Sequence, residues 1–119
     1  MSNLNEQDIA KIQEQNSIIE NLNEYEKLIE ELSEKEIALY QWKEVYDINA
    51  RKIEVTTNFK EIYGKNNAEV RKQHIKEELR DWHDHIKELE FSIDYVARRI
   101  SFLKELIRTK RTLMEVKHD

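Results

Sequence analysis

The feature that most constrains this chain is a repeat of apolar residues in its second half, spaced alternately four and three positions apart. The repeat runs unbroken over ten positions, is interrupted by Lys110 and resumes at Met114. A mean spacing of about 3.5 residues keeps one stripe of an α-helix facing a partner helix, whereas a strand needs alternation at every second residue. The second half therefore predicts one long coiled-coil helix. The ten positions of this seam are Ile75, Leu79, Trp82, Ile86, Leu89, Ile93, Val96, Ile100, Leu103 and Ile107.

The first half carries the same repeat less regularly. Charged Glu36 and Lys43 occupy two of its positions, and burying a charge is costly unless it is paired. We therefore expect looser packing at these two positions, or a contact filled instead by Tyr40 and Trp42. The apolar positions of this seam are Ile18, Leu22, Tyr25, Ile29, Leu32, Leu39, Tyr46, Ala50 and Ile53, with Leu28 beside it.

Two places in the first half weaken the prediction of a continuous helix. Ser33 followed by Glu36 matches a capping box, a pattern with which helices begin. Residues 55–58 combine β-branched side chains with an asparagine, and both have poor helix propensity. A kink near residue 33 and another near residue 56 therefore both remain open.

The scarcity of turn-forming residues limits the chain to a single reversal. The 119 residues include no proline and one glycine, Gly64, where average usage gives about 6 and 8. Gly64 suits the left-handed position that ends a helix, and Asn66 or Asn67 can cap the next one. A signal for the end of one helix, followed directly by a signal for the start of the next, predicts a long antiparallel coiled-coil hairpin and an all-α fold. We expect one domain over residues 1–119, with a first arm over about 5–62, a turn at 63–67 and a second arm over about 67–117.

The hairpin also accounts for an uneven distribution of charge. The net charge is −5, yet residues 1–50 hold 12 acidic and 4 basic side chains, and residues 51–119 hold 13 and 16. In a hairpin folded near residue 64, the acidic first half lies beside the basic stretch around residues 94–110. Exposed ion pairs contribute only about 0.2–1 kcal/mol each, so we expect apolar packing to hold the arms together and charge to select their register.

A second apolar stripe on the later helix lies off the seam. Three of its five residues are aromatic, and a two-helix hairpin has no third layer to cover them. We therefore expect a homo-oligomer, most simply a dimer of hairpins that forms a four-helix bundle. The alternative is a docking site for another protein. The stripe comprises Phe91, Tyr95, Phe102, Leu106 and Leu113.

A basic stretch in the later helix offers a second class of function. Lys104, Arg108 and Arg111 share one helical face, and Arg98 and Arg99 lie nearby. Such a stripe could follow the phosphates of a nucleic acid. The interpretation we favour is that these cations pair with the acidic arm, because the chain as a whole is acidic.

Histidines and carboxylates form one further stripe on the second arm, at His74, Glu78, Asp81 and His85. Their spacing places them on one helix face, where they could bind a divalent cation or respond to pH between about 5 and 7. A solvated face with His–carboxylate pairs one turn apart is the commoner arrangement for such a pattern. We therefore predict no metal site and no cofactor, and these four residues are the only metal candidates that we single out.

The composition argues against other classes of protein. No cysteine is present, which excludes disulfides, thiolate nucleophiles and cysteine metal sites. One glycine cannot build a phosphate-binding loop, and narrow helical bundles lack a deep pocket, so we do not expect an enzyme. No apolar run approaches the ~18 to 20 residues needed to cross a bilayer, and residues 1–12 lack the pattern of a secretory signal. We expect a cytoplasmic protein with no membrane partner.

Two segments resemble small helical proteins encoded by phages and prophages of Gram-positive bacteria. They are Thr57-Asn58-Phe59-Lys60-Glu61-Ile62-Tyr63-Gly64-Lys65 and Arg98-Arg99-Ile100-Ser101-Phe102-Leu103-Lys104-Glu105-Leu106, within a similarity that covers roughly residues 55–117. The resemblance implies a phage context and carries no functional residue with it. We therefore expect a non-enzymatic coiled-coil interaction protein, an effector or adaptor that binds a host or phage protein. The alternative is an accessory protein of phage DNA replication or recombination that contacts nucleic acid through the basic helix face.

Overall fold

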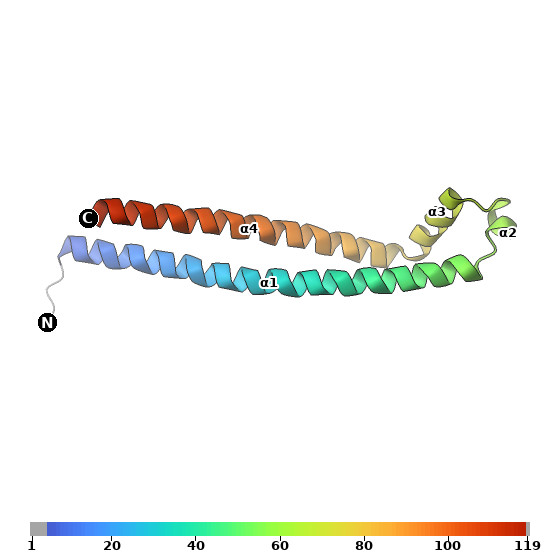
Figure 1. Ribbon diagram of the computed structural model, residues 1–119, viewed down its shortest axis with the longest axis horizontal. Coiled ribbons are helices and arrows are strands. Elements are labelled where there is room, and N and C mark those ends of the chain that lie inside the picture. The colour runs from blue at the N-terminus through green and yellow to red at the C-terminus, as the bar shows by residue number, and fades with distance from the viewer. Residues whose placement is uncertain (1–4, 119) are drawn as a thin grey trace. The chain divides into compact units, whose positions relative to one another are not determined.

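The computed structural model describes residues 5–118, the last of these by its backbone alone (Figure 1). Helix α1 spans Glu6–Thr56 and helix α4 spans Arg80–His118. Two shorter helices lie between them in sequence, α2 at Phe59–Tyr63 and α3 at Ala68–Glu78. No strand occurs within the described residues. The prediction of an all-α fold with two long helices is confirmed.

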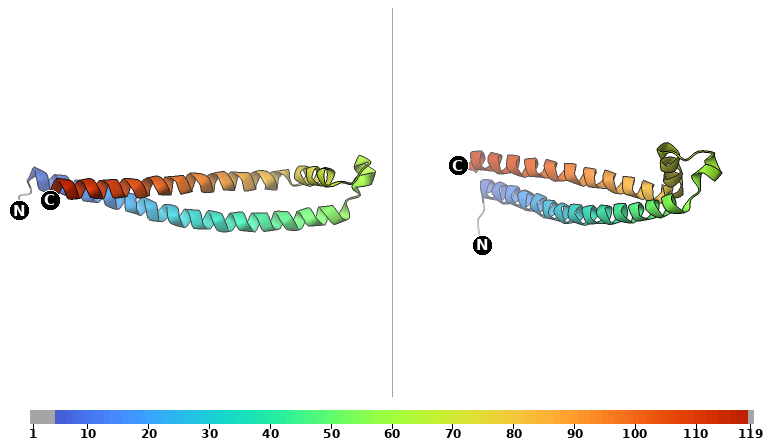
Figure 2. Two further views of the ribbon diagram at one scale, coloured as in Figure 1. Left: turned by 45° about the horizontal axis from the view of Figure 1, so that its top comes forward. Right: turned by 45° about the vertical axis from the view of Figure 1, so that its right-hand side comes forward.

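The described chain divides into two compact units. The first unit joins the part of α1 up to Ser33 to the part of α4 from Asp94 onward, and the second unit comprises Glu34–Ile93. Within each unit, the segments of α1 and α4 lie side by side and run in opposite directions (Figure 1 and Figure 2). Each unit is therefore held by contacts between residues that are far apart in the sequence.

An aliphatic seam holds the first unit together. Val96, Leu103 and Ile107 of α4 are buried, and Ile18 is the buried residue of α1. Burying an aliphatic side chain of this size contributes about 1.5–3 kcal/mol before the cost in conformational entropy. The alternating repeat thus predicts the buried face of α4 in this unit correctly.

Lys110 interrupts this seam and finds polar partners within it. Its Nζ donates hydrogen bonds to Ser17 Oγ and to Asn21 Oδ1, both at 2.6 Å, from α4 to α1. An ammonium group at a seam position would be costly without such partners. Paired in this way, Lys110 favours one register of α1 against α4, as single polar residues do in coiled coils.

The seam of α1 differs from the predicted one at alternate positions. In the first unit, Leu28 is half-buried whereas Ile29 is exposed. In the second unit, Trp42 is half-buried whereas Lys43 is exposed. At these places α1 faces α4 with the residue that directly precedes the predicted seam position, which leaves the charge of Lys43 in water. The expectation that Trp42 fills this contact is confirmed, and the same expectation for Tyr40 is wrong, because the Tyr40 side chain is exposed.

Of the two breaks left open in the first arm, the one near residue 56 occurs and the one near residue 33 does not. Helix α1 is uninterrupted at Ser33 and stops at Thr56, so the first arm, expected over about 5–62, continues beyond this point only as α2. Thr56 Oγ1 donates to Lys52 O at 2.7 Å, a side-chain bond of the kind that competes with helical backbone bonds. Asn58 then begins α2, because its Oδ1 accepts a hydrogen bond from Glu61 N at 3.1 Å. Local hydrogen bonds of side chains therefore accompany the end of α1 and the start of α2.

The turn has the predicted form. Gly64 has φ 73° and ψ −2°, the left-handed conformation, and its N–H donates to Lys60 O at 2.8 Å, which ends α2. Asn67 begins α3, since its Oδ1 accepts from Val70 N at 2.9 Å. A residue with a Cβ is strained at such a φ, so a glycine is favoured at this position.

The second arm is not one unbroken helix, which corrects the prediction for residues 67–117. Leu79 has φ −106° and ψ 27° and separates α3 from α4. Helix α3 turns away from the direction of α4 at this residue (Figure 1). The hydrogen bonds from Leu79 N to Ile75 O and from His83 N to Leu79 O are both 2.9 Å long, so the interruption is confined to a single residue.

Aromatic contacts account for this bend. The ring of His74 in α3 lies edge-on to Phe59 in α2, with centroids 5.3 Å apart, and Phe59 is only 1% exposed. Tyr63 OH forms a hydrogen bond of 2.6 Å with His74 Nδ1. These contacts hold α3 against α2. Since residues 75–83 contain neither proline nor glycine, the sequence carries no local signal of the bend.

Candidate functional site

The candidate surfaces lie on the part of α4 that belongs to the first unit, on either side of its seam. Each residue of one set directly precedes a seam position, and each residue of the other set directly follows one. One residue corresponds to about 100° around a helix, so the two sets flank the seam on opposite sides. We call them the aromatic flank, which is Tyr95, Phe102, Leu106 and Leu113, and the basic flank, which is Lys104, Arg108 and Arg111.

The aromatic flank is largely exposed. Tyr95, Phe102 and Leu113 are 71%, 54% and 58% exposed, and Leu106 is half-buried. Phe91, the fifth residue of the predicted stripe, belongs to the second unit and is 78% exposed. A row of large exposed apolar side chains is typical of an interaction surface.

Two cations of α4 that lie outside the basic flank are neutralised by α1. Arg99 donates to Glu24 through Nε at 3.0 Å and through Nη2 at 3.3 Å. The side-chain hydrogen bond to Glu24 raises the pKa of Arg99 above its ordinary value. Lys117 Nζ donates to Glu14 Oε1 at 3.2 Å. The expected pairing of the basic stretch with the acidic arm therefore occurs at these two residues.

The basic flank does not pair with α1, which corrects the expectation for these residues. Arg108 approaches Glu105 of its own helix at 3.9 Å. Among the described residues, neither Lys104 nor Arg111 forms an ion pair with a carboxylate. Arg98, the remaining candidate, pairs within α4 at 2.8 Å. The long cations of α4 thus divide into a set neutralised across the seam and a set that is not.

The basic flank forms one wall of a groove between α4 and α1. Two adjoining hollows of about 690 and 380 Å³ share Leu22 and Arg111 in their linings. We call the pair the basic groove. Its apolar lining comes from both helices, namely Ile18, Ile19, Leu22, Tyr25, Ile107 and Met114. Its charged lining is Lys11, Lys104, Arg108, Arg111, Glu105 and Glu115.

The four histidine and carboxylate candidates do not come together as a metal site. The bend at Leu79 lies between Glu78 and Asp81 and interrupts the spacing on which the stripe depends. His74 Nε2 lies 3.9 Å from Glu78 Oε1, one helical turn away. Within the described part of the chain, no group of three or more His, Cys, Asp or Glu side chains is placed to hold a metal ion.

An aromatic cluster in the second unit joins Trp82, a position of the predicted seam, to two residues that lie outside the alternating repeat. The rings of Trp42 and Trp82 meet edge to face at 6.0 Å, and Trp42 also lies 4.3 Å from the ring of His85. Trp42 belongs to α1 and the other two residues belong to α4, so the cluster joins the two helices. Aromatic pairs contribute about 0.5–1.5 kcal/mol beyond burial. His85, a metal candidate in the sequence, is a packing residue in the structure.

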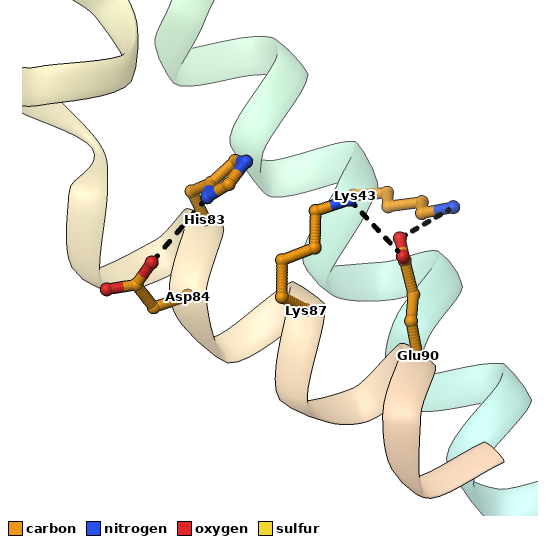
Figure 3. A network of polar contacts seen from close by, with 5 residues as sticks. All are labelled: Lys43, His83, Asp84, Lys87 and Glu90. Carbon is orange, nitrogen blue, oxygen red and sulfur yellow. Dashed lines mark hydrogen bonds and ion pairs between the residues drawn. The ribbon is translucent and has the colours of Figure 1, made fainter. Parts of the chain in front are cut away.

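The polar contacts of the second unit are exposed. Glu90 forms ion pairs with Lys43 of α1 at 3.6 Å and with Lys87 of α4 at 3.5 Å (Figure 3). His83 Nδ1 lies 3.6 Å from the carboxylate of Asp84, its neighbour in sequence. Exposed pairs of this kind contribute little free energy, and they are typical of a solvated face.

Comparisons with protein-family models, with curated proteins and with solved structures find no match for this chain. No helix among residues 5–118 contains a stretch long and apolar enough to cross a membrane. The two flanks of α4 are therefore the features from which we infer a function.

Proposed function

We propose that this chain is a non-enzymatic interaction protein that self-associates through the aromatic flank of α4. The observation that carries the proposal is the exposure of Tyr95 and Phe102, at 71% and 54%, on a helix whose adjacent face is buried. Aromatic side chains contribute strongly to the free energy of an interface that covers them. The resemblance to phage proteins supports a role as an effector or adaptor for a host or phage protein, and the genes beside this one test that context.

A second copy of the chain fits the aromatic flank by geometry. This flank lies about 100° around α4 from the seam, and each helix of a four-helix bundle packs on two neighbours about 90° apart. In such a bundle the seam of α4 contacts α1 of the same chain. The aromatic flank contacts α4 of the second copy across a two-fold axis.

Charge does not oppose this pairing of like surfaces. Arg99, which lies beside the aromatic flank, is paired with Glu24 of α1, and Arg98, three residues from Tyr95 and four from Phe102, is paired with Asp94 of its own helix. Because these charges are balanced within one chain, two aromatic flanks can approach each other without unpaired like charges between them. A symmetric dimer is therefore the assembly that we favour.

Sedimentation equilibrium on the full chain tests the proposal. We expect the wild-type chain to be a dimer and Phe102→Glu to be a monomer of unchanged helix content, because the substitution places a charge in the interface. Ser101→Glu, one position away and exposed, is the matched control and remains a dimer. A monomeric wild-type chain, or a Phe102→Glu variant that still dimerises, contradicts the proposal.

Nucleic-acid binding is the second candidate function, and the basic flank, which forms no ion pair with α1 among the described residues, favours it. Lys104, Arg108 and Arg111 present three cations along one helix face, as phosphate contacts require. The test is retardation of DNA in a gel at low salt, which should weaken steeply as salt rises and be lost in Lys104→Gln/Arg111→Gln. Absence of retardation at about 50 mM salt excludes this function.

A further inference from the structure

The basic groove has an apolar floor and a row of cations along one wall. Its floor is apolar, with Leu22 and Tyr25 from α1 and Ile107 from α4, and its α4 wall carries the cations of the basic flank. An occupant that satisfies both must bury apolar groups and present anionic groups along one edge. This requirement restricts the chemistry of the partner.

We propose that the basic groove binds one amphipathic helix of a partner protein, with an apolar stripe on the floor and acidic side chains along the edge that faces Lys104, Arg108 and Arg111. The cations follow one another at four and three residues, which is the spacing of successive positions on one face of a helix. Carboxylates at the same spacing on the incoming helix can therefore pair with all three. This inference concerns a different surface from the aromatic flank, so it does not depend on self-association.

The length of the groove sets the length of the occupant. Along α4 its lining extends from Lys104 to Glu115. At 1.5 Å per residue this stretch is about 17 Å long, which corresponds to about three turns of a bound helix. A segment of this length is marginal as a free helix in water, so we expect it to become ordered on binding.

The lining favours a helix over a nucleic acid. A phosphate backbone has no apolar face for Leu22, Ile107 and Met114 to contact. Glu105 and Glu115 also line the hollows and would repel phosphates, whereas a helix can place neutral or basic residues opposite them. The net charge of −5 opposes long-range attraction of DNA in the same way.

A labelled synthetic helix is the probe for this surface. It has about 14 residues, leucines on one face and glutamates along one edge, and its binding to the full chain is followed by fluorescence anisotropy. We expect saturable binding that weakens at least about tenfold when the glutamates are replaced by glutamines. A probe that does not saturate, or a glutamine version that binds equally well, overturns the proposal.

Matched variants of the chain locate the binding. Arg108→Glu/Arg111→Glu should weaken binding of the probe at least about tenfold, whereas Arg98→Glu/Arg99→Glu, which also reverses two charges but lies off the groove, should change it less than about twofold. If charge reversal lowers the helix content, the neutral variant Lys104→Gln/Arg111→Gln takes its place in the same measurement. Equal binding by the groove variants and the control overturns the proposal.

Two further measurements separate this proposal from the others. The Phe102→Glu variant should bind the probe with unchanged affinity even where it no longer dimerises, because the aromatic flank lies on the other side of the seam. Dissociation of the dimer by the probe would instead identify the basic groove as the self-association surface and overturn the inference. Displacement of the probe by a DNA duplex more readily than by unlabelled probe would identify a nucleic-acid surface, with the same consequence.

Discussion

The two units of this chain use the same two long helices and differ in what holds them. In the first unit, aliphatic side chains such as Val96 and Leu103 are buried along one seam. In the second unit, aromatic rings join the helices, with Phe59 against His74 and a tryptophan pair between α1 and α4. On α4 the alternating repeat holds in both units, with Ile86 buried in the second, whereas α1 departs from it in both units, at Ile29 and at Lys43. Periodic spacing therefore predicts the buried face of α4, the facing helix decides the buried face of α1, and caps and single rings decide the structure where the chain turns.

The largest effect should come from Phe59→Ala in the second unit. Phe59 is 1% exposed and packs on His74, and removing a buried phenyl ring costs about 3–5 kcal/mol. We expect native-state hydrogen exchange to show lost protection in residues 59–78 and retained protection in residues 94–113. Lys60→Ala, one position away and exposed, should leave both regions unchanged. An equal loss of protection in both regions would show that the two units are held by one common core.

Leu103→Ala is the corresponding change in the first unit. Leu103 is 0% exposed, and a buried leucine replaced by alanine costs about 2–5 kcal/mol, since it leaves a cavity. The expected loss is about 3 kcal/mol in urea denaturation, with exchange protection falling first in residues 94–113. Lys104→Ala is the exposed control and should be close to neutral. A loss below about 1 kcal/mol would argue against a close-packed aliphatic seam.

Gly64→Ala should have a smaller effect that is confined to the turn. A Cβ added at Gly64 meets nothing within 4 Å, so the cost arises from the backbone alone, at a φ of 73°. An L-residue in this conformation is disfavoured by about 1–2 kcal/mol, and we expect a loss of about 1 kcal/mol in the second unit. The melting temperature is compared with that of Lys65→Ala. A stabilised Gly64→Ala variant would mean that this residue does not hold a positive φ in solution.

The smallest effects should come from the ion pairs that join α1 to α4, and they should also differ between the units. Arg99 reaches Glu24 with two nitrogens, whereas Lys43 approaches Glu90 as a single charge at 3.6 Å. Both pairs remain in contact with water, so double-mutant cycles should give small coupling energies, larger for the first pair than for the second. Both values should fall as salt is added. A larger coupling for the lysine pair would contradict the ranking.

The parts of the fold that the sequence predicts are those with a local physical cause. Gly64 and Asn67 occupy the conformations that their side chains favour, and the buried face of α4 follows from residue spacing. The seam of α1 is harder to predict, because Leu28 and Ile29 are neighbours of similar hydrophobicity. Only the facing helix decides which of the two is covered. The end of α1 at Thr56 falls within residues 55–58, whose poor helix propensity indicates a weak point but does not decide between a kink and the end of the helix.

The candidate surfaces also combine features that the sequence predicts with features that depend on the packing of two helices. The exposure of Tyr95 and Phe102 can be predicted, since each lies one residue away from a seam position. The division of the cations cannot be predicted, because pairing depends on which carboxylates of α1 lie within reach of a flexible side chain. Arg99 forms an ion pair with Glu24, whereas Lys104 forms no ion pair with a carboxylate among the described residues. The apolar floor of the basic groove is likewise a property of the packed pair of helices and of neither helix alone.

Leu79 alone separates α3 from α4, and the backbone hydrogen bonds on either side of it remain intact at 2.9 Å. Returning its φ and ψ from −106° and 27° to helical values would merge the two helices without breaking those bonds. The free energy that opposes this merger comes from the contacts of Phe59 and Tyr63 with His74. A molecule that competes for these rings would therefore join two helices into one longer helix instead of unfolding one.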